Sequence, residues 1–172
     1  VTMRQLMHHR AGFEDSTRLF AVGDDDPRSL VDVLNQQQPA RVYAPGLRTS
    51  YSNWGSALAA QIVSDVSGEP YGDFLRREIL DPLGMHATTF VAPSKLEQAQ
   101  RSNLATGYKK GKGALALQGY MQIGPYWPAG GIASTATDMA RWMRLHLNGG
   151  ELDGVRLMSA KTHQQMWTRA YD

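Results

Sequence analysis

The stretch Ala44-Pro45-Gly46-Leu47-Arg48-Thr49-Ser50-Tyr51-Ser52-Asn53 leads directly into an apolar run from Trp54 to Val66. Pro45-Gly46 is typical of a turn, and the apolar side chains of the run recur at helical spacing until Ser67-Gly68 ends the pattern. The phenol of Tyr51 and the amide of Asn53 are therefore expected where a loop meets a helix N-terminus. Such a corner is held by packing, is open to a ligand and carries the positive end of the helix dipole.

A plain helix cap explains the same three residues. Ser and Asn are both favoured at the N-cap position, and a tyrosine beside them can simply pack against the helix. Taken alone, Tyr51-Ser52-Asn53 does not decide between a catalytic corner and a structural cap.

The composition indicates one globular domain. The chain has 172 residues, 42% hydrophobic and 20% charged, which suits a single core. Its net charge is +2 and no lysine or arginine run forms a stripe, so nucleic-acid binding is not expected. There is no cysteine, which excludes disulfides, thiol chemistry and cysteine-based zinc sites. The chain opens at Val1, close to a helix start, and we expect it to be a piece of a longer protein.

Helix signals recur along the chain. Thr2 and Gln5 form a capping box before a short helix that Gly12 is expected to end. Asp24-Asp25-Asp26-Pro27 predicts the start of a second helix, which carries Leu30, Val31 and Leu34. Beyond the run from Trp54, Pro70 begins a helix that ends at Asp81-Pro82-Leu83-Gly84, and Ser159 caps a final helix through Met166.

Thr135 and Asp138 predict a further helix with Met139, Trp142, Met143 and Leu147 along one side. We interpret Met139, Trp142 and Met143 as core rather than as a cofactor site. Strands are expected to be few and short: residues 88–91 and 115–117 are candidates, and residues 107–113 are expected to form a loop. Paired glycines at Gly130-Gly131 allow close backbone approach or a positive φ. The whole chain, residues 1–172, is predicted to form one mainly α domain.

Patterns for metals and phosphates are weak. His8 and His9 are adjacent and diverge by about 100° on a helix, while His146 and His163 stand alone on predicted helices. Gly111-Lys112-Gly113 lacks the further glycines of a phosphate loop, and no Gly-x-Ser-x-Gly elbow occurs. No metal and no organic cofactor is expected.

An ordered set of landmarks resembles the serine β-lactamase-related family, which includes class C β-lactamases, D-alanyl-D-alanine carboxypeptidases and family VIII esterases. The landmarks span essentially the whole chain: residues 6–13 (Leu-Met-His-His-Arg-Ala-Gly-Phe), Pro45-Gly46 with Tyr51-Ser52-Asn53, Val66-Ser67-Gly68 with Pro70-Tyr71, Pro82-Leu83-Gly84-Met85, and residues 130–135 (Gly-Gly-Ile-Ala-Ser-Thr) with Asp138. The resemblance implies the mostly helical lobe of the β-lactamase/penicillin-binding-protein-like α/β fold, without the flanking α/β lobe.

The family's chemistry uses a Ser-x-x-Lys nucleophile motif, a Tyr-x-Asn motif and a late Lys-Thr-Gly or His-x-Gly strand. By resemblance, Tyr51 would take the proton of the serine hydroxyl and pass it to the leaving group. Asn53 would hydrogen-bond the motif lysine and the substrate amide, while Ser52 would only shape the turn. An ordinary tyrosine ionises only near pH ~10, so a neighbouring cation is required, and the motif lysine is the natural one.

This chain departs from that pattern at several points. No serine is followed by lysine three positions later, so the nucleophile motif is absent. Lys161-Thr162-His163 imitates Lys-Thr-Gly but follows the helix cap Ser159, and we interpret it as a decoy. His9 matches the family's histidine ahead of the Ser-Gly pair and is expected to be structural. Gly130-Gly131 is expected near the edge of the site without a chemical role.

The resemblance implies that the longer protein is a serine hydrolase acting on a small-molecule amide, lactam or ester through an acyl-enzyme, to which this chain contributes Tyr51 and Asn53. The chain alone should be inactive. Without the α/β lobe it should expose apolar surface, which predicts self-association or partial disorder near its ends. A periplasmic or cell-envelope location is inferred from the resemblance alone. Two alternatives remain: a non-catalytic ligand-binding or interaction module of this fold, and an unrelated helical domain.

Overall fold

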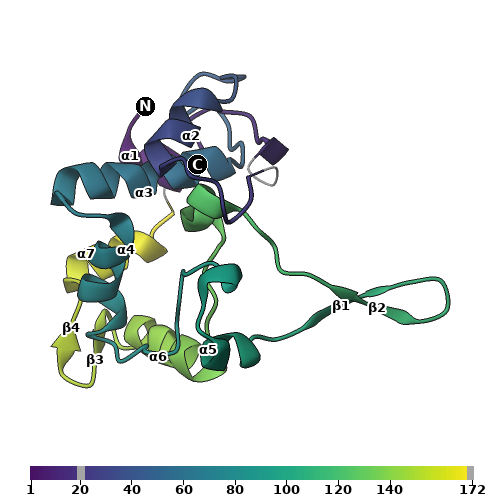
Figure 1. The fold of residues 1–172 in the computed structure, drawn as a ribbon. Helices are drawn as coiled ribbons and strands as arrows, with labels where there is room; N and C mark the ends of the chain where they lie inside the picture. The colour runs from purple at the N-terminus through teal and green to yellow at the C-terminus, as the bar shows by residue number, and fades with distance from the viewer. Residues whose placement is uncertain (19–21, 170–172) are drawn as a thin grey trace.

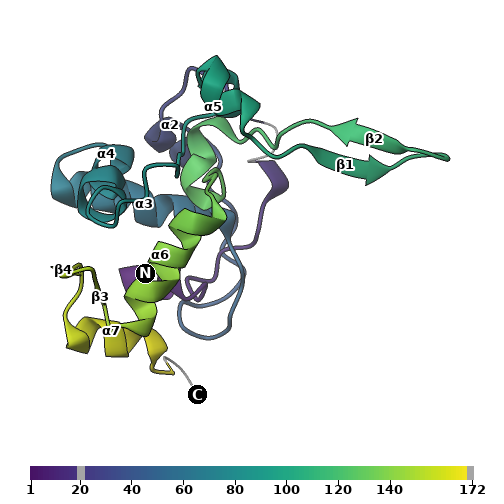
Figure 2. The same ribbon diagram turned by 90° about the horizontal axis from the view of Figure 1, so that it is seen from below.

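The computed structural model describes residues 1–18 and 22–169 as a mainly helical body from which one β-hairpin projects (Figure 1 and Figure 2). The α-helices are α1 (Met3–Met7), α2 (Leu30–Gln36), α3 (Asn53–Ser67), α4 (Tyr71–Leu75), α5 (Gln98–Ser102), α6 (Ala136–Leu147) and α7 (Ala160–Trp167). The π-helix η2 (Arg76–Leu80) continues α4, and the 3-10 helices are η3 (Pro93–Lys95) and η4 (Gly124–Ala129). Two antiparallel hairpins pair β1 (Gly107–Lys110) with β2 (Leu115–Gln118) and β3 (Glu151–Leu152) with β4 (Val155–Arg156).

Helix α3 is the element around which the N-terminal half is arranged. Ser52 is its N-cap, with a hydroxyl that accepts from the backbone N–H of Gly55 at 3.1 Å, and Gly68 ends it in the left-handed conformation (φ 76°). Both ends of this predicted helix are confirmed. Because α3 packs against α1, α2, α4 and η4, the position of its first turn is fixed by several neighbours.

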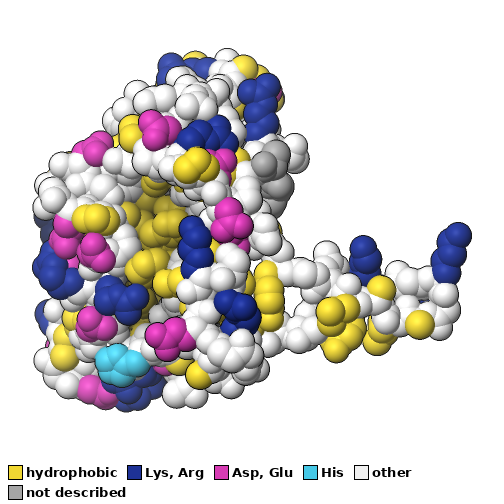
Figure 3. All heavy atoms as spheres, in the orientation of Figure 1, with side chains coloured by type: hydrophobic (Ala, Val, Ile, Leu, Met, Phe, Trp, Pro, Cys, Tyr) yellow, Lys and Arg dark blue, Asp and Glu magenta, His cyan; other side chains and the backbone are white. Residues whose placement is uncertain are grey.

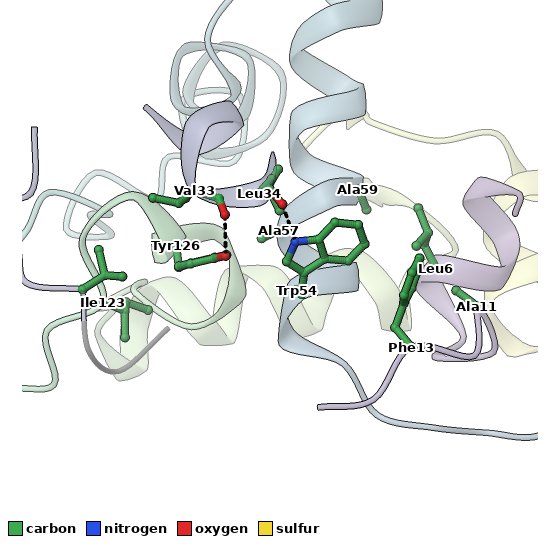
Figure 4. Close-up of a cluster of buried hydrophobic side chains, with 11 residues drawn as sticks. Leu6, Ala11, Phe13, Val33, Leu34, Trp54, Ala57, Ala59, Ile123 and Tyr126 are labelled. Carbon is green, nitrogen blue, oxygen red and sulfur yellow. Dashed lines mark hydrogen bonds between the residues drawn. The ribbon is translucent and has the colours of Figure 1, made fainter. Parts of the chain in front are cut away.

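A first hydrophobic cluster lies between α1, α2, α3 and η4 (Figure 4). The Trp54 indole donates to the carbonyl of Leu34 at 3.0 Å, and the buried Tyr126 hydroxyl donates to the carbonyl of Val33 at 3.2 Å. These carbonyls belong to the last turn of α2, where backbone acceptors depend on partners at or beyond the helix end; that of Val33 also accepts from the backbone N–H of Gln37 at 2.9 Å. The two aromatic side chains therefore bury apolar area and also complete the hydrogen bonding of a helix end.

A second cluster lies around η2, α6 and β3, and Trp127 connects it to the first. Tyr126 belongs to the first cluster, whereas the neighbouring Trp127 packs against the second. The Trp127 ring stacks on Phe90, with centroids 4.6 Å apart, and on Tyr71, with centroids 5.5 Å apart. Because the consecutive residues Tyr126 and Trp127 pack into different clusters, η4 joins the two clusters.

Three helix predictions need correction at their ends or faces. The first helix ends at Met7 rather than at Gly12; Gly12 does have a left-handed φ (84°), but it lies beyond the helix end, and His9 also has a left-handed φ (53°). The second begins at Leu30 rather than at Asp24, because Ser29 and Asp32 form the capping box. On α6, Trp142 packs against the second cluster, but Met139 and Met143 are 42% and 55% exposed. The expectation that these two methionines are core is wrong for this chain.

The strand predictions were right in part. Residues 115–117 lie in β2 as expected, but residues 107–110, expected in a loop, form its partner β1, with Tyr108 opposite Leu117. At residues 88–91 a single bridge joins Thr89 to Ala133. Nearby, the buried carboxylate of Asp138 accepts from the Thr88 hydroxyl at 2.8 Å. None of the helices in residues 1–18 and 22–169 has the length and apolar character to cross a membrane.

Candidate functional site

Tyr51 and Asn53 meet at the N-terminus of α3. The Tyr51 hydroxyl donates to the Asn53 side-chain oxygen Oδ1 at 2.9 Å. Asn53 is the first residue of the helix, and Tyr51 is 55% exposed. The predicted meeting of loop and helix is therefore present, with a phenol oxygen that solvent or a ligand can reach.

The loop before this corner is held by the segment that follows α1. Backbone N–H groups of Gly46 and Ser50 donate to the carbonyls of Arg10 and His9, each at 2.7 Å, and the Ser50 hydroxyl donates to the carbonyl of Phe13 at 2.8 Å. The Arg10 guanidinium also donates to the carbonyl of Gly46. Residues 9–13 thus position the loop that presents Tyr51.

Two residues of this supporting segment, His9 and Gly12, have a left-handed φ. His9 has a left-handed φ, and its ring lies against Tyr51 with centroids 4.5 Å apart. Its Nδ1 accepts from the backbone N–H of Ser52 at 3.3 Å, which requires that nitrogen to be unprotonated. Gly12 has φ 84°, and a Cβ there would lie 2.0 Å from the carbonyl oxygen of Tyr43. Glycine is therefore required at position 12.

Asp15 is a member of this corner that the sequence analysis missed. Its Oδ1 accepts from both the backbone N–H and the side-chain Nδ2 of Asn53, each at 3.1 Å. No helical spacing links positions 15 and 53. The available signal was a carboxylate shortly after the Gly12-Phe13 landmark.

Two cavities lie away from the corner. One, of about 420 Å³, is lined in part by Asp26, Arg28, Trp127, Gly130 and Gly131. The other, of about 510 Å³, lies between α2, the end of α3 and η4. Neither Tyr51 nor Asn53 lines either of these cavities. On one face, Figure 3 shows a hollow with hydrophobic side chains at its base. The Tyr51 corner is an open surface instead.

Asp26 and Arg28, which both line the first cavity, form an ion pair. The side-chain hydrogen bonds of Arg28, which reach Asp26 at 2.6 and 2.9 Å, lower the pKa of this carboxyl to about 2, and the backbone N–H of Arg28 adds to the effect. A carboxyl with a lowered pKa adds stability above its unfolded value, and that contribution is lost as the pH falls towards about 2. The pair therefore gives the cavity a fixed charged edge.

The remaining candidates from the sequence, Gly131, Lys161-Thr162 and the two histidines of α6 and α7, lie away from the Tyr51 corner in the chain. The backbone of Gly131 lies close to the Trp127 side chain, since a Cβ at position 131 would be 2.8 Å from the Trp127 Cβ. Lys161 and Thr162 lie on α7, which Ser159 caps, so their predicted helical context is confirmed. His146 and His163 come together, with ring centroids 5.9 Å apart, and desolvation followed by the His163 charge lowers the pKa of His146. Within the described residues, no group of three or more His, Cys, Asp or Glu is placed to hold a metal.

The family model described as Beta-lactamase matches residues 1–171. Penicillin-binding protein 4 of Amycolatopsis lactamdurans is 30% identical over 173 residues, which cover 93% of this chain and 42% of that protein. The D-alanyl-D-alanine-carboxypeptidase/endopeptidase AmpH of Escherichia coli K12 is 36% identical over 106 residues, covering 61% of this chain and 25% of AmpH.

The structural comparison shows the fold. The octameric penicillin-binding protein homologue from Pyrococcus abyssi superimposes with a TM-score of 0.77 at 23% identity, covering 98% of this chain and 38% of that one. The fold is thus penicillin-binding-protein-like and, in this chain, mainly α-helical. The chain spans less than half the length of these relatives. The match over residues 1–171 shows that the chain belongs to the Beta-lactamase family.

Proposed function

We propose that residues 1–172 are the helical lobe of a serine hydrolase that works through an acyl-enzyme, and that Tyr51 and Asn53 supply its Tyr-x-Asn motif. The observation that carries this proposal is the hydrogen bond between the exposed Tyr51 hydroxyl and Asn53 at the start of α3, in a chain of the Beta-lactamase family. The names of the relatives, a penicillin-binding protein and a carboxypeptidase, support the reaction class.

The proposed reaction begins when a serine hydroxyl of the longer protein attacks the carbonyl carbon of an amide, lactam or ester. Tyr51, ionised to the phenolate beside the motif lysine, accepts the serine proton on its oxygen and then passes that proton to the leaving nitrogen or oxygen as the bond to the acyl carbon breaks. Water then attacks the acyl-serine ester and gives up a proton by the same route, which releases the acid. The Asn53 amide holds the motif lysine and the substrate amide.

The nucleophile and the lysine come from outside these residues in this proposal, because no serine of the chain is followed by lysine at the third position. The open surface around Tyr51 supports the same division, since the corner lines neither cavity described above. The α/β lobe would form the opposite wall of the substrate cleft. The chain by itself is then inactive.

Covalent labelling of the full-length protein tests the proposal. A fluorescent penicillin or a fluorophosphonate is expected to label one serine outside residues 1–172, and peptide mass spectrometry identifies the residue. The expressed 172-residue chain is the matched control and should remain unlabelled. Failure of both probes to label a folded full-length protein would contradict the hydrolase and indicate a ligand-binding module of the same fold.

The substrate is proposed to be a lactam, a D-amino-acid peptide or a simple ester, and the location the periplasm or cell envelope. The support is the set of relatives named above, one a penicillin-binding protein and one a D-alanyl-D-alanine carboxypeptidase. Comparing the rates at which the full-length protein hydrolyses a β-lactam, a D-alanyl-D-alanine peptide and a simple ester distinguishes the three.

An uncovered apolar face supports the proposed second lobe as partner. Met139, Met143 and Leu147 follow one another at a spacing of four residues along α6 and are 42%, 55% and 84% exposed. Four-residue spacing places them on one stripe of the helix. Large apolar side chains in a row on a surface are typical of an interface.

The isolated chain is therefore expected to self-associate through this stripe of α6. Sedimentation velocity from micromolar to millimolar concentration should show dimers or larger species for the wild type, and mainly monomers for Met143→Glu/Leu147→Glu. Val66→Glu is the matched control, because Val66 is 83% exposed but lies at the end of α3. A wild-type chain that stays monomeric throughout would refute the expectation.

A further inference from the structure

We propose that Asp15 is a positioning residue that determines which end of the Asn53 side-chain amide faces Tyr51. Its consequence for catalysis rests on the proposed function of Tyr51 and Asn53, whereas the orientation itself rests on contacts within this chain. Asp15 belongs to the segment after α1, 38 residues away in sequence from Asn53. Its role was not apparent from the motif.

The contacts show Asp15 bound to Asn53 twice. One carboxylate oxygen accepts from the backbone N–H and from Nδ2 of Asn53, both at 3.1 Å, and the other oxygen lies 3.5 Å from Nδ2. The backbone N–H of Asn53 belongs to the first turn of α3, where N–H groups lack helical partners and a negative charge is favoured. Asp15 therefore completes a helix end and binds a functional amide at once.

The chemistry of a carboxylate decides the direction of the amide. An ionised carboxylate can only accept hydrogen bonds, and the NH2 end of an asparagine amide is its only donor. The NH2 of Asn53 must therefore face Asp15, which leaves Oδ1 facing Tyr51. The Tyr51 hydroxyl accordingly donates to Oδ1, at 2.9 Å.

The backbone on each side of Asp15 is itself held in place. The N–H of Glu14 donates to the carbonyl of Ala40 at 3.0 Å, and the carbonyl of Phe13 accepts from the Ser50 hydroxyl at 2.8 Å. Phe13 is buried in the first cluster. Asp15 is thus exposed to solvent, but the backbone segment that carries it is held in place.

This orientation matters for the proposed reaction. A carbonyl oxygen accepts through its lone pairs, so Oδ1, which accepts from the neutral Tyr51 hydroxyl in this structure, can accept from an ammonium group or a substrate N–H when Tyr51 is the phenolate. A flipped amide would instead present its NH2 to the phenol and to the incoming cation, where it could not accept. Asp15 thus keeps an acceptor at the place where the proposed lysine must bind.

The first test observes the amide directly in this chain by NMR. In Asp15→Ala the Asn53 side-chain NH2 signals should shift upfield and exchange faster with water, and the Tyr51 ring carbon bearing the hydroxyl should shift with them. The isosteric Asp15→Asn should give one averaged set of Asn53 NH2 signals, shifted between those of wild type and Asp15→Ala, because an amide partner permits both orientations and rotation of the side chain exchanges them rapidly. Glu14→Ala is the control and should leave these signals unchanged. Unchanged Asn53 signals in Asp15→Ala would overturn the inference, whatever the activity of the longer protein.

The second test measures labelling of the full-length protein. Asp15→Ala is expected to slow acylation about tenfold, the size of effect that loss of one well-placed charged hydrogen bond produces. Asp15→Asn should lie between Asp15→Ala and wild type. Wild-type rates for Asp15→Ala would overturn the positioning role. Absence of labelling in the wild type itself would refute the proposed function instead, and the NMR result would still decide the orientation.

Discussion

Replacing Tyr51 by phenylalanine is expected to slow acyl-enzyme formation in the full-length protein about 10²- to 10⁴-fold, the contribution typical of one general acid–base group. The substitution removes only the hydroxyl that donates to Asn53. Because Tyr51 is 55% exposed, loss of its hydroxyl and of the hydrogen bond to Asn53 should leave the fold intact. The measurement is the rate of labelling by fluorescent penicillin or fluorophosphonate, followed by rapid quench and gel fluorescence.

The matched control for this experiment is Tyr108→Phe. Tyr108 is 59% exposed, similar to Tyr51, but lies on the projecting β1–β2 hairpin. It should label at the wild-type rate. If Tyr51→Phe also labels at the wild-type rate, Tyr51 does not transfer the proton, and the corner at α3 is a helix cap.

Trp54→Ala is expected to destabilise the chain by about 3–5 kcal/mol, the range for removing a buried large aromatic side chain. Trp54 is 7% exposed, packs edge-on against Phe13 with centroids 4.7 Å apart, and donates to the carbonyl of Leu34 at 3.0 Å. Its loss would open a cavity in the first cluster and remove the indole donor from the Leu34 carbonyl. Single domains are typically stable by about 5–15 kcal/mol, so this loss is a large fraction of the total stability.

Urea unfolding followed by far-UV circular dichroism measures the effect. Trp54→Phe keeps much of the apolar area but has no indole N–H. Its free energy of unfolding should fall by about 1–3 kcal/mol, because the Leu34 carbonyl is left unsatisfied. Val66→Ala, at an exposed position of the same helix, should change stability by no more than about 0.5 kcal/mol. A loss below about 1 kcal/mol for Trp54→Ala would mean that Trp54 does not support α3.

The helix predictions that the structure confirms rest on strong local signals. Ser52 and Gly68 bound α3 because one supplies a capping hydroxyl and the other tolerates a left-handed backbone. The capping box of Thr2 and Gln5 likewise forms as expected. The second helix was misplaced because Asp24-Asp25-Asp26-Pro27 carries an equally good starting signal, whereas Asp26 instead binds Arg28.

Long-range contacts account for the remaining errors. Residues 107–110 have a loop-like composition, yet they pair with β2 because backbone hydrogen bonding is available to almost any sequence. On α6, the apolar pattern correctly predicted a helix but could not say which part of its surface this chain covers. The exposed Met143 and the buried Leu145 differ in their neighbours, not in their local signals.

The sequence by itself determined the family, through an ordered set of landmarks along the chain, and it determined the principal helices and the placement of Tyr51 and Asn53 where a loop meets a helix, because these depend on residues close in the chain. The tertiary structure alone decided that Asp15 binds Asn53 and that His9 lies against Tyr51. It also decided that the apolar stripe of α6 is exposed in these residues. These features join segments some 40 residues apart or depend on what covers a surface, and local patterns carry neither kind of information because the packing of the whole chain sets both.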